Sequence, residues 1–301
     1  MSSKYKVLKY NLNKFENIDD LVSVEEPLEI SIKYKDKNNW ITKILSITMR
    51  TPGNDKDLVR GFLFNEQIIT NIKDVDSIES YGEKVGQYNI QNKILATVNN
   101  SKNIDITKIK RDFITNSSCG VCGKSSLDAL EIIKSNKTDL NLPKISKEII
   151  IQSPSILRKN QSEFSKTGGI HASGLFNASG ELIDLKEDVG RHNALDKLIG
   201  STLLAGQISP LDQFITCSGR LNFELVQKVL MNDIGIMIGV GAPMECSRLE
   251  KVEQILEIRR NEKMSIAVSS ENFGLKASMS ENNKKDLLNS EKEEEGGCAV
   301  S

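Results

Sequence analysis

Residues 213–240 read QFITCSGRLNFELVQKVLMNDIGIMIGV, and this stretch decides the fold class. The apolar runs at 213–217 and 234–240 each predict a buried strand. Between them, Ser218-Gly219-Arg220 predicts a tight turn, and the apolar spacing over 223–231 predicts a helix. Strand, turn, helix and strand make a βαβ unit, so the two strands should be parallel and part of an α/β layer.

The sequence upstream extends this layer. Residues 169–186 predict a β-hairpin that turns at Asn177-Ala178-Ser179-Gly180, and a helix should follow over 193–200. Residues 146–161 predict helical structure that is interrupted near Pro154, because proline removes a backbone donor from the helix.

The N-terminal part is different in character. Residues 1–35 read as a polar lead-in with one or two short strands, one of them at 28–32. Residues 40–49 predict a strand that Thr51-Pro52-Gly53 ends, and Asn54 or Asp55 can cap the helix that follows. Short alternating runs over 75–98 predict a meander of strands.

We therefore predict an α/β protein with a smaller β-rich N-terminal part. The predicted division is a β-rich part at 1–110, an α/β domain at 111–270 and a disordered tail at 271–301. The tail is predicted from its composition, which is rich in Glu, Lys, Asn and Ser.

Composition narrows the class of function. The 301-residue chain has 40 basic and 41 acidic residues, a balance that argues against a surface built to coat nucleic acid. No apolar run approaches the roughly 18 residues of a membrane-spanning helix, and the N-terminus shows no secretory signal. Five cysteines are too few for a secreted disulfide framework. The sequence thus predicts a cytoplasmic protein without a membrane or nucleic-acid partner.

Chemistry is concentrated at Cys119 and Cys122, within the segment Ser117-Ser118-Cys119-Gly120-Val121-Cys122-Gly123-Lys124-Ser125-Ser126. Glycines and serines around the two thiols predict an exposed loop. Such a loop can hold a metal, cycle a disulfide or carry sulfur.

The surrounding sequence favours one of these three functions over the other two. A structural zinc site commonly has two pairs of ligands, and a second pair is missing, so zinc would require His171 or His192. Thioredoxin-like cycling needs a βαβ context around the cysteines, which the pattern does not supply. A phosphate-binding loop would need glycine at position 118, where serine stands. Sulfur carriage without a structural metal ranks first.

Two further segments could hold an anion. Ser218-Gly219-Arg220 lies between a strand and a helix N-terminus, where free N–H groups favour phosphate; a plain tight turn is the alternative. Arg191 and His192 begin a predicted helix in the segment 187–193, where capping by Asp188 and Asn193 is the alternative. His171 lies within a strand pattern and is interpreted as a hydrogen-bonded core histidine.

Several motifs in register over about residues 40–243 make the chain resemble the FdhD family of formate dehydrogenase accessory sulfurtransferases. These motifs are Arg50-Thr51-Pro52-Gly53, Gly61-Phe62-Leu63, Ser118 to Leu127, Thr167-Gly168-Gly169-Ile170-His171-Ala172, Glu187 to Lys197, and Ser218-Gly219-Arg220 with Phe223 to Lys228.

The resemblance implies a sulfur carrier with a cytidine-deaminase-like α/β layer that forms a homodimer. Such proteins take persulfide sulfur from a cysteine desulfurase and deliver it to the molybdenum bis-molybdopterin guanine dinucleotide cofactor, which is then inserted into the formate dehydrogenase catalytic subunit. By this resemblance Cys119 bears the persulfide and Cys122 assists. The nucleotide phosphates would rest against Ser218-Gly219-Arg220 and against Arg191 and His192.

The sequence departs from the family pattern after Gly241-Ala242-Pro243, where Met244-Glu245-Cys246-Ser247-Arg248-Leu249 leads into a predicted highly charged helix and then a strand at Ser265-Ile266-Ala267-Val268. This departure leaves an alternative function open, a non-catalytic module that binds guanine nucleotide or molybdenum cofactor. A zinc protein is the third hypothesis.

Overall fold

The structure is a computed structural model that describes residues 1–11, 14–36, 39–99, 145–206, 208–209, 212–240, 252–260 and 262–269. The described strands are β1 (Ser2–Asn11), β2 (Lys14–Ser23), β3 (Glu26–Asp36), β4 (Asn39–Arg50), β5 (Val75–Val85), β6 (Ile90–Val98), β7 (His171–Asn177), β8 (Leu182–Asp188), β9 (Gln213–Cys217), β10 (Ile236–Val240), β11 (Val252–Arg260) and β12 (Glu262–Ser269). The described helices are α1 (Asp55–Asn65), α3 (Lys147–Asn160), α4 (Ser162–Thr167), α5 (Arg191–Ala205), α6 (Phe223–Leu230) and the short 3₁₀ helix η1 (Ile72–Asp74).

The predicted βαβ unit lies at the centre of a six-stranded sheet of order β11-β12-β10-β9-β7-β8. Strands β9 and β10 are parallel, with Ile238 opposite Thr216, and the remaining pairs in this sheet are antiparallel. The mixed α/β fold is therefore confirmed, as is the hairpin of β7 and β8.

The charged helix predicted before the strand at 265–268 is wrong. Residues 252–260 form strand β11, whose backbone pairs with β12 in an antiparallel hairpin. Pairing with a neighbouring strand therefore decided the structure of this charged segment.

Helices cover both faces of this sheet, because its central strands are buried on both sides. Phe214 of β9 and Ile238 of β10 lie in one core cluster with residues of α3. Their neighbours Ile215 and Met237 lie in another, with residues of α5 and α6. Successive side chains of a strand point to opposite faces, so one continuous apolar run serves both cores.

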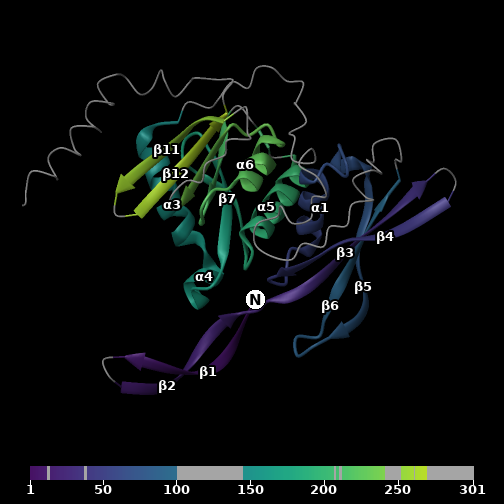
Figure 1. Ribbon diagram of the computed structural model, residues 1–301, viewed down its shortest axis with the longest axis horizontal. Helices are drawn as coiled ribbons and strands as arrows, with labels where there is room; N and C mark the ends of the chain where they lie inside the picture. Colours follow the sequence, from purple (N-terminus) through teal and green to yellow (C-terminus); the bar gives the residue numbers. More distant parts are fainter. Residues whose placement is uncertain are drawn as a thin grey trace, which may run out of the picture.

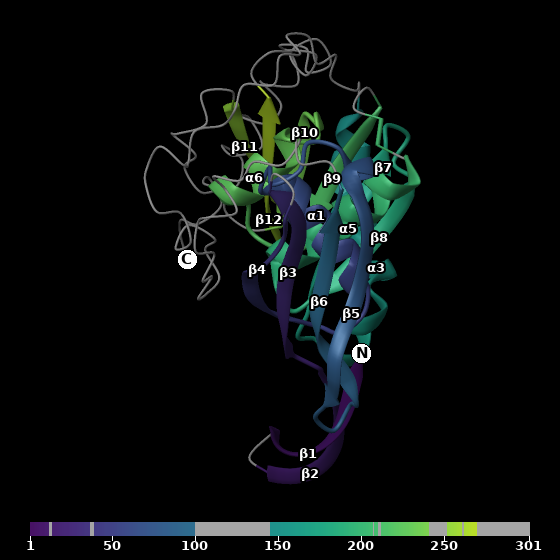
Figure 2. The same cartoon turned by 90° about the vertical axis from the view of Figure 1, so that its right-hand side faces the viewer.

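The β-rich N-terminal part contains a four-stranded sheet of order β4-β3-β6-β5. Helix α1 packs on this sheet through a third core cluster that includes Leu58 and Leu63. The same helix lies against α5, so α1 stands between the four-stranded sheet and the rest of the molecule (Figures 1 and 2).

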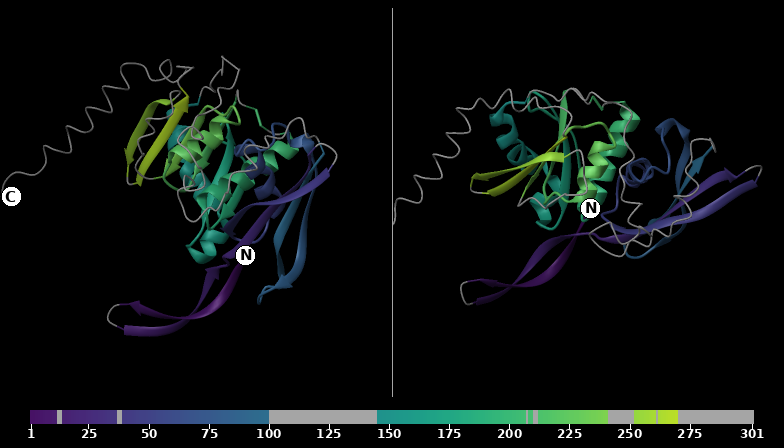
Figure 3. Two further views of the ribbon diagram at one scale, coloured as in Figure 1. Left: turned by 45° about the vertical axis from the view of Figure 1, so that its right-hand side comes forward. Right: turned by 45° about the horizontal axis from the view of Figure 1, so that its top comes forward.

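The prediction of a polar lead-in over 1–35 is wrong in extent. Residues 28–32 belong to the longer strand β3, and β1 pairs with β2 in a long hairpin that extends away from the body (Figure 3). Most side chains of this hairpin are exposed on both faces, Leu8 and Phe15 among them. A strand without a buried face has no alternation of polar and apolar residues, so the sequence carried no signal for it.

The predicted interruption near Pro154 is also wrong. Helix α3 runs through Pro154 to Asn160, and α4 begins at Ser162. Proline deprives the carbonyl of Ile150 of its usual donor four residues later. The hydroxyl of Ser153 donates to that carbonyl oxygen at 3.1 Å instead, so the helix continues.

Helix α1 begins where predicted, but side-chain capping does not start it. Asn54 occupies the N-cap position in the left-handed conformation (φ 56°) and makes no capping side-chain bond. Buried Arg50 binds both carboxylate oxygens of Asp55, at 3.1 and 3.0 Å, and donates to the carbonyl of Glu26 at 3.2 Å. This fork ties the end of β4 to the first turn of α1.

No helix within the described ranges is long and apolar enough to cross a membrane. The predicted boundary near residue 110 and the predicted tail at 271–301 lie outside the described residues, so this division of the chain remains a prediction.

The contact between α1 and α5 requires two glycines. A Cβ atom on Gly61 would overlap the backbone of Asp196, and one on Gly200 would overlap the backbone of Asp57. Glycine allows two backbones to approach this closely because it has no side chain. The two helices thus join the two sheets backbone to backbone.

We expect Gly61→Ala and Gly200→Ala each to destabilise the protein by about 1–3 kcal/mol, because the added methyl group overpacks the contact. In a helix with free space the same change would stabilise the protein by about 1 kcal/mol. The sign of the change in stability therefore shows whether the two backbones are in close contact. Urea denaturation measures the difference. The matched control is Gly169→Ala, whose added Cβ would meet no atom closer than 3.9 Å. A stabilised Gly200→Ala protein would contradict the close contact.

Candidate functional site

The site forms where β9 ends beside the beginning of β7. Ser173 lies opposite Cys217 in this antiparallel pair, so His171 comes to the carboxyl edge of β9. The backbone N–H of Ser218 donates to the carbonyl of Ala172 at 2.9 Å. The N–H of Ala172 donates to Ser218 Oγ at 2.8 Å, and this Oγ lies 3.5 Å from His171 Nδ1.

Gly219 provides the space at this point. A Cβ atom on Gly219 would lie 3.4 Å from His171 Cε1 and Nδ1, and 3.7 Å from Arg191 Cδ. The absent side chain therefore leaves a small recess between an imidazole and an arginine. The structure brings together Ser218, Gly219 and Arg191, which the sequence predicted as cofactor-binding residues from two separate segments.

The other two predicted cofactor-binding residues, His192 and Arg220, are placed differently. His192 Nε2 lies 3.3 Å from the side-chain nitrogen of Asn222 and 3.1 Å from a carboxylate oxygen of Glu224. Asn222 also caps α6, since its side-chain oxygen accepts from the N–H of Leu225 at 3.1 Å. The histidine thus faces the start of α6, whereas Arg220 is exposed.

Behind His192 lies a buried group of charges. Lys228 contacts Asp196 at 2.8 Å and reaches Glu66 and Glu224 at 3.6 and 4.0 Å. Burial lowers the pKa of Lys228, but the three carboxylates outweigh it and leave the pKa raised, so this lysine is charged. The charged lysine holds the side of α6 that carries Glu224.

The electrostatics of the recess favour an anion. Burial, then the charge of Arg191, then His192, lower the pKa of His171, and Asp188 opposes them. The imidazole of His171 is therefore neutral at neutral pH. A negative ligand beside it would be attracted by the charge of Arg191, as basic side chains and backbone N–H groups hold the anion in P-loops and other anion sites.

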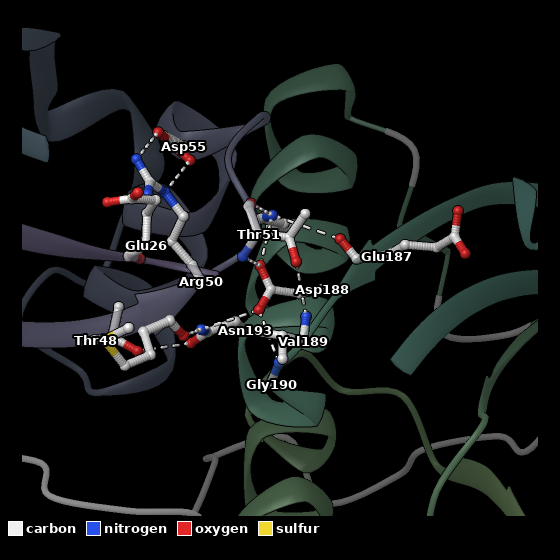
Figure 4. A network of polar contacts seen from close by, with 12 residues as sticks. Glu26, Thr48, Arg50, Thr51, Asp55, Glu187, Asp188, Val189, Gly190 and Asn193 are labelled. Atoms are coloured by element: carbon white, nitrogen blue, oxygen red, sulfur yellow. Dashed lines mark hydrogen bonds and ion pairs between the residues drawn. The ribbon is translucent and has the colours of Figure 1, made fainter. Parts of the chain in front are cut away.

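A buried carboxylate holds the start of α5 in place (Figure 4). Asp188 is fully buried and accepts hydrogen bonds from the N–H of Thr51 at 3.1 Å and of Gly190 at 2.9 Å. It also pairs with Lys197 at 2.6 Å, and Lys197 donates to the carbonyl of Thr51 at 2.8 Å. The N–H of Val189 returns a bond to Thr51 Oγ1 at 3.1 Å.

The predicted capping role of Asp188 and Asn193 is thus replaced by a link between the two halves of the chain. Asn193 donates to the carbonyl of Met49 at 2.8 Å and to Asp188 at 3.2 Å, and accepts from Thr48 at 3.3 Å. Helix α5 begins after Gly190 with no side-chain cap. The turn after β4 therefore positions the segment that carries Arg191.

Cys119 and Cys122 lie outside the described residues, so their predicted role is not tested by these contacts. Within the described ranges, no group of three or more His, Cys, Asp or Glu side chains could hold a metal ion. Cys217 is buried beneath the site, and burial raises its pKa to about 12 against a smaller opposing effect of Ser173. This thiol does not form a thiolate at neutral pH.

Sequence reasoning interpreted His171 as a hydrogen-bonded core histidine; the ring does contact Ser218 Oγ, but it lies outside the core. The ring is only half-buried and lies in the recess. Pairing of β7 with β9 would have placed it there, since the first residue of an antiparallel neighbour lies at the carboxyl end of β9. That pairing could not be inferred from the hairpin pattern alone.

Comparisons with known proteins agree with this architecture. Residues 23–248 match the FdhD/NarQ family. Sulfur carrier protein FdhD from Sulfolobus acidocaldarius is 40% identical over 240 residues, covering 80% of this chain and 85% of that protein. The protein of the same name from Sulfurisphaera tokodaii is 42% identical over 225 residues, covering 75% and 79%.

A solved structure shares the fold. It is a Desulfotalea psychrophila protein described as a formate dehydrogenase accessory protein, with a TM-score of 0.61 and 22% sequence identity. The likeness covers 88% of this chain and 96% of that one.

The link through Asp188 predicts a large loss of stability in Lys197→Met. Removing one partner of a buried ion pair leaves an uncompensated charge, which costs about 3–5 kcal/mol. The double variant Asp188→Asn/Lys197→Met should lose less than Lys197→Met alone, because the buried charge is gone. Urea denaturation measures both. Lys186→Met is the control, since Lys186 and Asp184 form a partly exposed pair that contributes about 1 kcal/mol or less. Equal losses in Lys197→Met and Lys186→Met would contradict the link.

The pKa of His171 predicts the direction of a pH effect. Because the folded state lowers this pKa, its neutral form is preferred, and the resulting stability is present above the unfolded value of about 6.5. It is lost as pH falls from there through the folded pKa. Lowering the pH from about 7.5 to about 5.5 should therefore reduce Tm by roughly 1–3 °C more in the wild type than in His171→Gln. Identical pH profiles would show that His171 is not under this repulsion.

Proposed function

Since the chain belongs to the FdhD/NarQ family, we propose that it is a sulfur carrier that delivers sulfur to a molybdenum cofactor required by formate dehydrogenase. The observation that carries the proposal is the convergence of two distant motifs at Gly219, which brings Ser218 and Gly219 beside Arg191 and His171. The relatives named as sulfur carriers support the type of chemistry.

We place sulfur uptake at Cys119 and Cys122. The thiolate of Cys119 attacks the outer sulfur of a persulfide on a cysteine desulfurase, and a new S–S bond forms on Cys119. The S–S bond of the donor breaks and its cysteine leaves as a thiolate, so the transfer needs no oxidant. Cys122 assists release of the sulfur to the acceptor. A persulfide is a reversible modification of cysteine, as a carrier requires.

The acceptor is molybdenum bis-molybdopterin guanine dinucleotide, bound as a substrate. The chain's own residues bind its nucleotide phosphates: Ser218 and Gly219 supply the recess, and Arg191 and Arg220 supply positive charge. His192 is positioned by Asn222 and Glu224 at the same helix start. The residues present thus fit the anionic part of this substrate.

The remaining partners follow from this function. The donor is a cysteine desulfurase and the recipient of the sulfurated cofactor is the formate dehydrogenase catalytic subunit. Both reactions belong to the cytoplasm, and the carrier acts as a homodimer.

Persulfide uptake on the two predicted cysteines tests the proposal. Incubation of the full chain with a cysteine desulfurase and free cysteine should add the mass of one sulfur atom, which intact-mass spectrometry detects. Cys119→Ala/Cys122→Ala should take up none. The matched control is Cys217→Ala, which should be labelled as the wild type is, because the buried Cys217 thiol has a pKa of about 12.

Sulfur on the Cys119→Ala/Cys122→Ala protein would contradict the assignment of the carrier thiols. Guanosine diphosphate binding without any sulfur uptake would favour the alternative function, a binding module for the nucleotide or cofactor. Stoichiometric zinc in the purified chain would favour the third hypothesis.

A further inference from the structure

Most of the exposed large apolar side chains in the described part of the chain lie in two places. The first is the hairpin of β1 and β2, residues 2–23, which we call the arm. The second is the outer face of β4, which we call the stripe. The arm exposes Tyr5, Leu8, Tyr10, Phe15 and Val22, and the stripe exposes Trp40, Ile44, Ile47 and Met49.

The arm has apolar side chains on both of its faces. Residues opposite one another in an antiparallel pair share a face. Tyr10 lies opposite Phe15, with ring centroids 4.8 Å apart, and Leu8 is on the same face two residues earlier. Val7 and Ile18 form a pair on the other face. Since an isolated two-stranded hairpin is only marginally stable in water, the arm needs a further surface to cover it.

The described contacts between the arm and the body lie at the base of the arm. Ser23 Oγ lies 2.6 Å from Thr167 Oγ1 of α4, and the side chain of Gln87 donates to the hydroxyl of Tyr5 at 3.3 Å. A cavity of about 460 Å³ lies between the arm and the turn at Gln87 and Tyr88. The rest of the arm extends away from the body (Figures 1 and 3). Its far half, where Leu8 and Phe15 are 62% and 68% exposed, thus presents an apolar surface to solvent.

A β-bulge keeps the stripe on one face of β4. Ile44 lies opposite Ser31 of β3, whereas Ser46 lies opposite Ile30, so β4 has one extra residue at this point. Without the extra residue, the alternation of side chains would place Ile44 and Ile47 on opposite faces. The stripe is therefore a single apolar surface along a strand at the edge of its sheet.

The arm and the stripe match in length and in charge. Each strand of the arm has ten residues, and β4 has twelve. Strand β2 carries the acidic residues Glu16, Asp19 and Asp20. Lys33 and Lys35 of β3 lie on the outer face beside the stripe, because they pair with residues 42 and 40 of β4. Opposite charges at the rim of an apolar contact favour one orientation of the two partners.

The arm and the stripe of one copy extend in opposite directions from the body (Figures 1 and 3). We propose that two copies of this chain exchange arms, so that each arm covers the stripe of the other copy. The exchange rests on the homodimer of the proposed function and states where its two copies meet. Under a two-fold axis the contact occurs twice, so the apolar surfaces of both copies are covered.

The area of this contact is sufficient for a stable dimer. At the usual rise per residue and strand spacing, one face of the arm is about 33 Å long and about 10 Å wide. Two contacts, counted on both copies, would bury on the order of 1,300 Å², which lies within the range of stable interfaces.

The stripe also ends beside the candidate functional site. Asn193 donates to the carbonyl of Met49 at 2.8 Å, and Arg191 and His192 precede Asn193 at the start of α5. The arm of one copy would therefore lie next to the site of the other.

A charged substitution on each surface tests the exchange. The full wild-type chain should sediment as a dimer. Leu8→Glu and Ile44→Glu should each weaken the dimer at least about tenfold, because a charge buried in an apolar contact has no partner. The matched control is Leu204→Glu, which should dimerise as the wild type does, because Leu204 is 59% exposed at the end of α5, outside both surfaces.

Circular dichroism confirms that each variant is folded. A monomeric wild-type chain would overturn the proposed exchange, as would dimers of Leu8→Glu and Ile44→Glu that are as tight as those of the wild type.

A photoreactive side chain locates the contact without a charged substitution. Benzoylphenylalanine replaces Phe15 in the full chain, and ¹⁵N-labelled and unlabelled copies are equilibrated together and then irradiated. We expect mass spectrometry to find crosslinks from position 15 of one copy to residues 26–50 of the other, the segment of β3 and β4. Crosslinks confined to a single copy, or to other segments of the second copy, would contradict the exchange.

The outcome is independent of the sulfur-carrier test. If the chain takes up no persulfide but position 15 crosslinks to the stripe of the other copy, the sulfur-carrier function fails and the inference stands. If the chain takes up persulfide while Leu8→Glu and Ile44→Glu dimerise as the wild type does, the inference is wrong and sulfur carriage stands.

Discussion

The buried carboxylate of Asp188 is the constraint on which the rest of the structure depends. A charge removed from water must be compensated by hydrogen bonds and an opposite charge, and its partners come from both halves of the chain: the N–H of Thr51 after β4, and Gly190 and Lys197 around α5. Burial nevertheless raises the pKa of this group, against the effect of Lys197. Any displacement between the two halves would leave the buried charge without its partners, so their relative position is strongly determined. This also determines the direction in which Arg191 leaves the start of α5.

The glycines between α1 and α5 make the same junction possible sterically. Gly61 and Gly200 let the backbones of α1 and α5 touch. Thr51, which lies just before α1, is therefore close enough for its N–H to bond to Asp188. Arg50, fully buried, then fastens Asp55 to the start of β3 and the end of β4. Packing and polar bonding therefore act together here. The helix contact sets the distance between the two sheets, and the hydrogen bonds set how the sheets are aligned. The recess at Gly219 lies at the edge of this rigid base.

Much of the secondary structure could be predicted, and the failures have physical causes. The βαβ unit and the hairpin of β7 and β8 have clear periodicity because their faces are buried. The hairpin of β1 and β2 lacks a buried face and gave no such pattern. Pro154 indicated a helix break that Ser153 prevents by supplying the missing donor. Of the predicted site residues, Ser218, Gly219 and Arg191 lie close together, and their role stays a prediction; His171 was assigned to the core because its partner strand was unknown.

The sequence by itself determined the α/β class, the segments that carry chemistry and the family to which they belong, because motif spacing and apolar periodicity are local properties of the chain. Only the tertiary structure decided that Thr51 bonds to Asp188, that His171 stands beside Gly219, and that Lys197 lies buried between two halves far apart in sequence. Those contacts depend on strand pairing and on the approach of two helices. Several arise from the burial of groups whose partners are far away in the sequence, 137 residues for Thr51 and Asp188 and 46 for Ala172 and Ser218. No local pattern records which distant group will satisfy them.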